Sequence, residues 1–294
     1  MDEADVAVVG GSFAGAAAAL HVARGRRRVA MFDHGVTRNR FARESHGFPG
    51  QDGASPAAIR AKARAEVLAY PEAALVEAEV TAARRDGEGF VLGWDGGSLR
   101  ASRVVLAFGM RDLLPDVPGL ADCWGLTANQ CPYCHGYELA GRPTAVLMTG
   151  SGSLHQARIL RAWTDDLMLV TDGLDLADAE RADLAARGVR VVDGRLTGVE
   201  HEHGHVRAIA VDGQTVERGA LYLAPRFEPA SGLAAALGCA MADAELGRHV
   251  AADAMGAAGP GVFAAGDLVR PVYNATRSAA EGVTAGAAAH QSLL

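Results

Sequence analysis

The stretch VAVVGGSFAGAAAALHVA, residues 6–23, decides the fold of this chain. Its opening VAVV reads as a buried apolar strand, and the alanine-rich end reads as a helix. Between them, Gly10 and Gly11 form a tight turn, Gly15 allows the helix to pack closely on the strand, and Ser12 is small enough to keep the backbone open. Such a turn holds the pyrophosphate of a dinucleotide at the start of the helix.

A second apolar strand follows this helix. VAMF at 29–32 leads directly into Asp33, which lies about 20 residues beyond the glycines. A carboxylate in this position accepts hydrogen bonds from a ribose 2′-hydroxyl. The two strands and the turn therefore predict a dinucleotide site. The alternative is a βαβ unit that binds no nucleotide and leaves Asp33 solvated.

The composition narrows the class of protein. A chain of 294 residues exceeds the roughly 100–150 residues of one ordinary domain, so we expect two. A net charge of −7 provides no basic surface for nucleic acid. The apolar positions are interrupted by charges, and MDEAD leads straight into a strand without a signal-peptide pattern, so we expect a cytoplasmic protein with no membrane span. In a reducing compartment, a disulfide is more often catalytic than structural.

The remaining elements suggest an interrupted first domain. FVLGW, a DGG turn and SLRASRVVLAFG predict a β-meander, and LPDVPG reads as a linker. TAVLMTGSGSLHQARILRAW, residues 144–163, then repeats the strand, glycine turn and helix pattern, and LMLVTDG adds a strand. The expected fold class is α/β with two dinucleotide-binding, Rossmann-like domains. The first domain is split over 1–113 and 226–294, and the second is inserted as 114–225.

TANQCPYCHGYE, residues 127–138, carries the most reactive groups. A Cys-x-x-Cys pair followed by histidine occurs in haem attachment, in zinc sites and in redox-active dithiols. Haem attachment usually needs export, and zinc needs a second pair of ligands, for which only Cys123 and scattered histidines are nearby. A buried structural pair is the simplest alternative. The Pro-Tyr spacer favours a dithiol at a helix N-terminus, where the helix dipole lowers a thiol pKa.

Three other histidines could suggest a metal site. His201, His203 and His205 alternate at strand spacing, which predicts that they share one face of a strand. No carboxylate or cysteine cluster accompanies them, so we predict solvated histidines and no metal.

The order and spacing of these motifs resemble the low-molecular-weight thioredoxin reductases over nearly the whole chain. The resemblance is greater to the flavin-dependent dithiol oxidases of the gliotoxin and holomycin type. Their most specific shared element is the Cys-x-x-Cys-His-Gly-Tyr-Glu run at 131–138.

The resemblance implies FAD as the cofactor. In GVFAAGD, Gly266 and Asp267 would face the ribityl chain and phosphates, and the helix that begins NATRSAAEG, with Thr276 in its first turn, would face the flavin or simply pack in the core. Gly109, at the end of the meander, is implied in the same site. His46, in the loop RNRFARESHGFPG, is either a flavin neighbour or an ordinary surface histidine.

The resemblance also implies roles for the three reactive residues. Cys131 would exchange with the substrate, Cys134 would lie against the flavin, and His135 would act as acid and base. Thioredoxin reductases have an aspartate after the second cysteine, whereas His135 matches the oxidase branch. A histidine titrates near neutral pH, which suits removal of a proton from a thiol.

The second glycine turn departs from the pattern of NADPH-dependent reductases. His155 stands where a small residue normally packs, the next strand ends at Asp172, and no arginine cluster follows to bind a 2′-phosphate. NAD(P)H is therefore a doubtful cofactor.

The leading prediction is an FAD-dependent thiol-disulfide oxidoreductase, a homodimer by resemblance, that oxidises a small-molecule dithiol with oxygen. One alternative is a thioredoxin reductase-like enzyme that passes electrons from NAD(P)H or another donor to a thioredoxin-like protein. The other is a flavin redox sensor without turnover.

Overall fold

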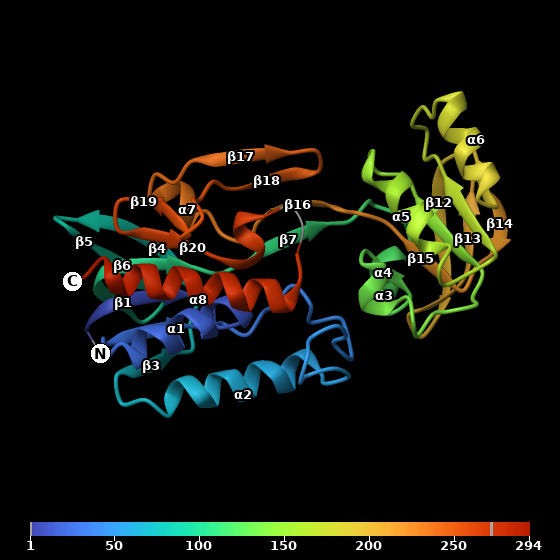
Figure 1. Ribbon diagram of the computed structural model, residues 1–294. Coiled ribbons are helices and arrows are strands. Elements are labelled where there is room, and N and C mark those ends of the chain that lie inside the picture. The colour runs from blue at the N-terminus through green and yellow to red at the C-terminus, as the bar shows by residue number, and fades with distance from the viewer. Residues whose placement is uncertain (1, 271–272) are drawn as a thin grey trace. The chain divides into compact units, whose positions relative to one another are not determined.

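The computed structural model describes residues 2–270 and 273–294 (Figure 1). Contacts divide the chain into two compact units. The first comprises Met1–Arg40, Phe48–Arg111 and Phe227–Leu294, and the second comprises Phe41–Gly47 and Asp112–Arg226. The short segment Phe41–Gly47 therefore groups with the second unit, although it follows β2 of the first.

The first unit is built on a parallel sheet with the strand order β3-β2-β1-β6-β20. These strands are β1 (Glu3–Val9), β2 (Val29–Phe32), β3 (Ala73–Val76), β6 (Gly97–Leu106) and β20 (Val262–Ala264). One face packs against the helices α1 (Phe13–Arg24), α2 (Pro56–Leu68) and α8 (Ala275–Gln291). The valines and alanines of the central strands are fully buried in this core, which explains their continuous apolar runs.

The opposite face of this sheet packs against irregular structure and short strands. β4 (Val80–Asp86) and β5 (Gly89–Trp94) form an antiparallel meander with the first half of β6, as predicted. The remaining elements are β7 (Met110–Leu113), β16 (Arg226–Pro229), α7 (Leu233–Ala236), β17 (Met241–Ala244), β18 (Gly247–Val250), β19 (Ala257–Gly259) and the 3-10 turn η1 (Gly266–Val269).

Helices α1 and α8 lie side by side because α8 has glycine where the two backbones meet (Figure 1). A Cβ atom on Gly282 would overlap the backbone of Ala14, and one on Gly286 would lie 2.6 Å from the carbonyl oxygen of Ala18. Residues four apart share a helix face, so the two glycines form one seam. The seam fixes the start of α8 and the preceding η1 turn relative to the start of α1.

The second unit repeats the architecture in smaller form. Its parallel sheet has the order β11-β10-β9-β15-β8. The strands are β8 (Ala128–Asn129), β9 (Thr144–Leu147), β10 (Leu167–Val170), β11 (Val189–Val192) and β15 (Ala220–Tyr222). Helices α5 (Gly152–Leu160) and α6 (Asp178–Ala186) share one core with this sheet. The antiparallel strands β12 (Leu196–Glu202), β13 (His205–Val211) and β14 (Gln214–Glu217) share the other, with α3 (Leu120–Cys123).

The two units confirm the predicted α/β class with two dinucleotide-binding folds, the second inserted into the first. The predicted strand through three histidines is wrong. β12 ends at Glu202 and β13 begins at His205, and His203 has φ 51° in the turn between them. The cause is a tight hairpin at His203-Gly204. Within the described residues, no helix is long and apolar enough to cross a bilayer.

Candidate active site

The first glycine turn joins the end of β1 to the start of α1. Gly10 has φ 109°, and a Cβ atom there would overlap the carbonyl oxygen of Ala107, just beyond β6. A Cβ atom on Gly15 would overlap the carbonyl oxygen of Gly10. Both positions therefore require glycine for space, and Gly10 also for its backbone angle. Ser12 is the N-cap of α1, but its side chain caps no amide of the helix.

Asp33 lies at the end of β2, directly beside this turn. The carboxylate is buried, with 7% of the residue exposed. A Cβ atom on Gly11 would lie 2.8 Å from Oδ2 of Asp33, so the missing side chain leaves this oxygen facing the turn. Oδ1 accepts a hydrogen bond from the Gly35 amide at 2.9 Å and lies 3.9 Å from Nη1 of Arg60.

Asp267, in η1, is held by two further side chains. Its Oδ1 accepts a hydrogen bond from the Ser278 hydroxyl on α8 at 3.1 Å, and its Oδ2 lies 3.1 Å from Nη1 of Arg38. Arg38 also stacks over the ring of Tyr273, with its Cζ 3.5 Å from the ring centroid. Sequence analysis missed Arg38. The only signal for it was the arginine-rich loop after Asp33.

The other predicted cofactor residues of the first unit are Gly266, Gly109 and Thr276. Gly266 has φ 75°, and a Cβ atom there would come 2.9 Å from that of Ala14 on α1. Gly109 lies two residues beyond Ala107, and its carbonyl oxygen accepts a hydrogen bond from the Ala230 amide. Thr276 is exposed in the first turn of α8.

These features fit the pyrophosphate and ribose of a dinucleotide. The start of α1 has amides that no side chain caps, and α1 has twelve residues to build a dipole. The turn has no side chain at Gly10 and Gly11 to obstruct a phosphate, and Asp33 stands beside it as an acceptor for a ribose hydroxyl.

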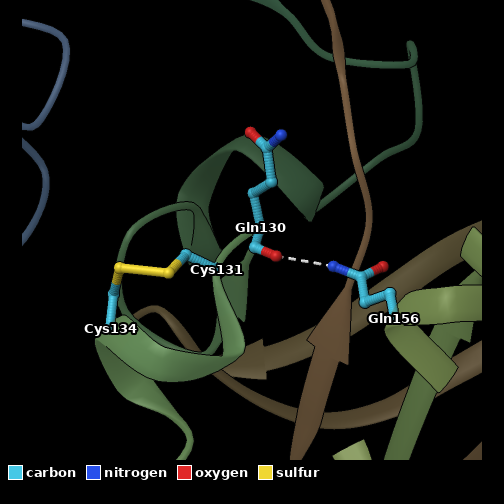
Figure 2. The surroundings of a disulfide bond; sticks show 4 residues. All are labelled: Gln130, Cys131, Cys134 and Gln156. Carbon is cyan, nitrogen blue, oxygen red and sulfur yellow. Dashed lines mark hydrogen bonds between the residues drawn. A yellow bond between two sulfur atoms is a disulfide. The ribbon is translucent and has the colours of Figure 1, made fainter. Parts of the chain in front are cut away.

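The second unit carries a disulfide between Cys131 and Cys134 (Figure 2). Cys131 is the N-cap of α4 (Pro132–His135), and the two Cα atoms lie 5.3 Å apart. The helix is a single turn, so its dipole is weaker than the sequence suggested. Trp163 supports it: the Tyr133 ring meets Trp163 edge-on at 5.4 Å between centroids.

The other two cysteines, Cys123 and Cys239, are buried as free thiols. Burial, and then the charge of Asp122, raises the pKa of Cys123 to about 11. Burial also raises the pKa of Cys239. Because the thiolate is the reactive form, these two are inert beside the Cys131-Cys134 pair.

His135 follows Cys134 at the end of α4 and is half-buried. Burial lowers its pKa, while Glu138 raises it and His46 lowers it further. Burial is the largest of these causes and favours the neutral imidazole. A neutral imidazole can accept a proton from a thiol.

A side chain of α5 holds the backbone just before the disulfide in place. Nε2 of Gln156 donates a hydrogen bond to the carbonyl oxygen of Gln130 at 2.5 Å (Figure 2). Gln156 lies next to His155 at the second glycine motif, and its side chain binds the backbone just before the redox turn. Sequence analysis missed this residue because nothing local links a helix glutamine to a cysteine pair.

His46 lies in the segment that groups with the second unit. Its Nε2 is 3.5 Å from Oε1 of Glu138 and 3.6 Å from Oε2 of Glu44. The side chain of His46 is only 18% exposed.

The second glycine turn differs from the first in its bonding. Ser153 is buried, and its hydroxyl accepts a hydrogen bond from the Thr149 amide at 3.0 Å. Asp172 has φ 52°, and its Oδ1 accepts a hydrogen bond from the Leu196 amide at 2.9 Å. His155 is exposed on α5, so the expectation that it occupies the close-packing position is wrong. The buried small residue at the start of α5 is Ser153, two residues before His155.

Comparison with known proteins decides the family. The model of the family described as "pyridine nucleotide-disulphide oxidoreductase" matches residues 4–286. The chain belongs to this family. It is therefore an oxidoreductase enzyme, and the resemblance expected from the sequence is confirmed.

Individual relatives match over nearly the full length. "Thioredoxin reductase tcpT" of Claviceps purpurea is 30% identical over 99% of this chain and 94% of its own length. Among solved structures, an oxidoreductase from Agrobacterium tumefaciens is 37% identical, with a TM-score of 0.93 over 99% of this chain and 98% of that one. The structure of HlmI is 38% identical, with a TM-score of 0.91 over 98% of this chain and 92% of that one. Pyridine nucleotide-disulphide oxidoreductases typically bind FAD, which agrees with the glycine turn and Asp33.

Proposed function

We propose that this oxidoreductase binds FAD and oxidises a small-molecule dithiol to a disulfide, with oxygen as the final electron acceptor. The observation that carries the proposal is the Cys131-Cys134 disulfide with His135 directly beside it. A disulfide next to a base accepts electrons from thiols, whatever later removes them.

We assign FAD to the first unit, which corresponds to the predicted domain 1–113 and 226–294. Gly10, Gly11, Ser12 and Gly15 would form the pyrophosphate turn, and Asp33 would accept from the adenosine ribose. Asp267 would contact the ribityl and phosphate portion, with Gly266, Gly109 and Thr276 around the flavin. Bound FAD would supply the two-electron acceptor that restores the disulfide. Oxygen would then take the two electrons from the reduced flavin and be released as hydrogen peroxide.

Oxidation of the dithiol at the disulfide takes two thiol-disulfide exchange steps. His135 takes the proton of one substrate thiol, and the resulting thiolate attacks Sγ of Cys131, so that Cys134 leaves as a thiolate. The second substrate thiol then loses its proton and attacks the first substrate sulfur, which releases Cys131. The substrate loses two electrons and two protons, and the enzyme pair gains them as a dithiol.

The bonding of the second glycine turn supports electron entry from thiols and not from NADPH. Ser153 already accepts from the Thr149 amide, and Asp172 already accepts from the Leu196 amide. A carboxylate at the end of this strand also repels a 2′-phosphate. The predicted second domain, 114–225, would then keep the fold of a nucleotide domain and use it to carry the disulfide.

A reductase driven by NAD(P)H is the second candidate, and one observation favours it. Nη2 of Arg195 lies 3.3 Å from the position of a Cβ atom on Gly173, next to Asp172. The end of β10 therefore has one positive side chain that the sequence pattern did not indicate. A thioredoxin-like protein would then be the partner.

Anaerobic mixing distinguishes the two directions. The purified protein is mixed with dithiothreitol in one stopped-flow experiment and with NADPH or NADH in another, and the flavin absorbance is followed. We expect dithiothreitol to bleach the flavin much faster than either nicotinamide, and hydrogen peroxide to form only in the aerobic dithiol reaction. Rapid bleaching by NADPH or NADH would support the reductase. A protein that bleaches with neither would fit the redox sensor.

A further inference from the structure

The segment Phe41–Gly47 brings His46 to the chain just after the redox turn. It packs within the second unit: a Cβ atom on Gly125 would lie 2.6 Å from that of Phe41. At the other end of the segment, His46 is paired with Glu138 at 3.5 Å. Packing at one end and an ion pair at the other fix the segment next to α4.

Glu138 lies three residues beyond His135. The backbone continues to turn after α4, because the Leu139 amide donates to the carbonyl oxygen of His135 at 3.2 Å. Residues three apart in such a turn are neighbours. The charges of Glu138 and His46 both act on His135, whereas Glu44, which reaches His46 equally well, is not among the causes of the shift in the pKa of His135.

The charge of Glu138 also acts on a third group, on the sheet. Tyr222 on β15 is 1% exposed, and its hydroxyl has no hydrogen-bond partner among the described residues. Burial raises the pKa of Tyr222, and the charge of Glu138 raises it further, so this phenol stays protonated and adds no charge near Glu138. Among the described residues, the charge of Glu138 acts on His135 and Tyr222, and its carboxylate pairs with His46.

We propose that Glu138, held in place by His46, is the positioning carboxylate of the dithiol centre. This inference rests on the proposed role of His135 as the base. When His135 takes a thiol proton it becomes an imidazolium, and a fixed carboxylate at the i+3 position stabilises that charge. His46 then belongs to the disulfide chemistry of the second unit, and its position in the loop after Asp33 is explained without a contact to the flavin.

The chain supplies a matched control for this proposal. Glu44 and Glu138 lie at similar distances from His46, 3.6 Å and 3.5 Å. Glu44→Gln therefore removes one negative charge next to His46 without removing the carboxylate that acts on His135. Glu138→Gln removes both interactions, and Glu138→Asp keeps the charge on a shorter side chain.

The first experiment is an NMR titration of the His135 ring in the oxidised protein, with its signal assigned from a His135→Asn variant. Glu138→Gln should lower the pKa of His135, because a stabilising negative charge is lost. Glu138→Asp should restore part of the shift, and Glu44→Gln should leave the pKa unchanged. An unchanged value in Glu138→Gln, or an equal shift in Glu44→Gln, would overturn the proposal.

A double-variant cycle tests whether His46 holds the carboxylate. If it does, the effect of Glu138→Gln on the pKa of His135 should be smaller in a His46→Gln background. Simple addition of the two effects would show that His46 acts only through its charge and would refute the positioning role. In kinetics, Glu138→Gln should reduce kcat/KM for a dithiol by about tenfold, and Glu44→Gln should not.

These readouts separate the inference from the proposed function. The titration needs neither turnover nor bound FAD. If the pKa of His135 responds as expected but His135→Asn oxidises dithiols normally, the proposed base is wrong while the Glu138 interaction stands. If His135→Asn is inactive and Glu138→Gln changes nothing, only the inference fails.

Discussion

Nη1 of Arg38 lies 3.1 Å from Oδ2 of Asp267, and the two side chains are 13% and 18% exposed. The pair joins the loop after β2 to the turn after β20, two parts of the first unit that are more than 200 residues apart in the chain. Partial burial makes the pair stronger than an exposed one. It also leaves Asp267 neutralised where a cofactor bearing two phosphates is expected to bind.

Arg38→Met should therefore weaken FAD binding by roughly tenfold or more, because it removes a positive charge beside Asp267 where the phosphates are expected. The dissociation constant can be measured by fluorescence titration of the FAD-free protein. Arg84→Met is a suitable control, since Arg84 pairs with Asp86 on an exposed strand. Equal FAD affinity in the Arg38 and Arg84 variants would rule out a role for Arg38 at the cofactor.

The two glycine motifs should respond differently to alanine. In Gly15→Ala the new Cβ would overlap the backbone of Gly10, and we expect a loss of about 2 kcal/mol or more in the free energy of unfolding. In Gly152→Ala the new Cβ meets nothing within 4 Å, so stability should be unchanged or slightly raised, as alanine favours a helix over glycine. Denaturant titrations of both variants test this. A Gly152 variant as unstable as the Gly15 variant would contradict it.

The two redox cysteines should differ in their reaction with disulfides. If Cys131 is the exchanging thiol, Cys134→Ser should form a lasting mixed disulfide when reduced protein is treated with 2-hydroxyethyl disulfide, because no second thiol can resolve it. Cys131→Ser should form this adduct far more slowly. Mass spectrometry of the intact protein measures both. A faster reaction in Cys131→Ser would invert the assignment.

The pH dependence of dithiol oxidation should report the buried state of His135. Burial is the main cause that lowers the pKa of His135 below its ordinary value of 6.5, and the base must be neutral to act. As the pH falls, kcat/KM should therefore hold through 6.5 and drop only at the lowered pKa. His135→Gln should be slow and should lack this acid limb. If kcat/KM falls already above pH 6.5 and still does so in the variant, the titrating group is not His135.

The structures of the local motifs could be predicted because each motif is a continuous stretch whose residues are required by one local backbone conformation. The glycine turn at Gly10 and Gly15 needs space between a strand and the next helix, and that need is visible in the residues themselves. The Cys131-Cys134 pair is likewise closed within one turn. For the same reason, the α/β class and the repeat of the nucleotide fold could be predicted without a structure.

The second glycine motif shows where this approach fails. The spacing of the glycine motif placed His155 at the close-packing position, but α5 is oriented so that Ser153 is buried and His155 is exposed. The rotation of a helix about its axis depends on the whole core it packs against, and a motif of a few residues does not contain that information.

By itself the sequence determined the local bends, the buried strands and the chemical identity of the reactive pair, because backbone angles and apolar periodicity act between near neighbours. Only the tertiary structure decided which distant charges meet: Arg38 with Asp267, and His46 with Glu138. The physical reason is that the sequence around a charged residue carries no periodicity that identifies its partner. The partner is determined by the packing of sheets and helices, which brings two distant loops together.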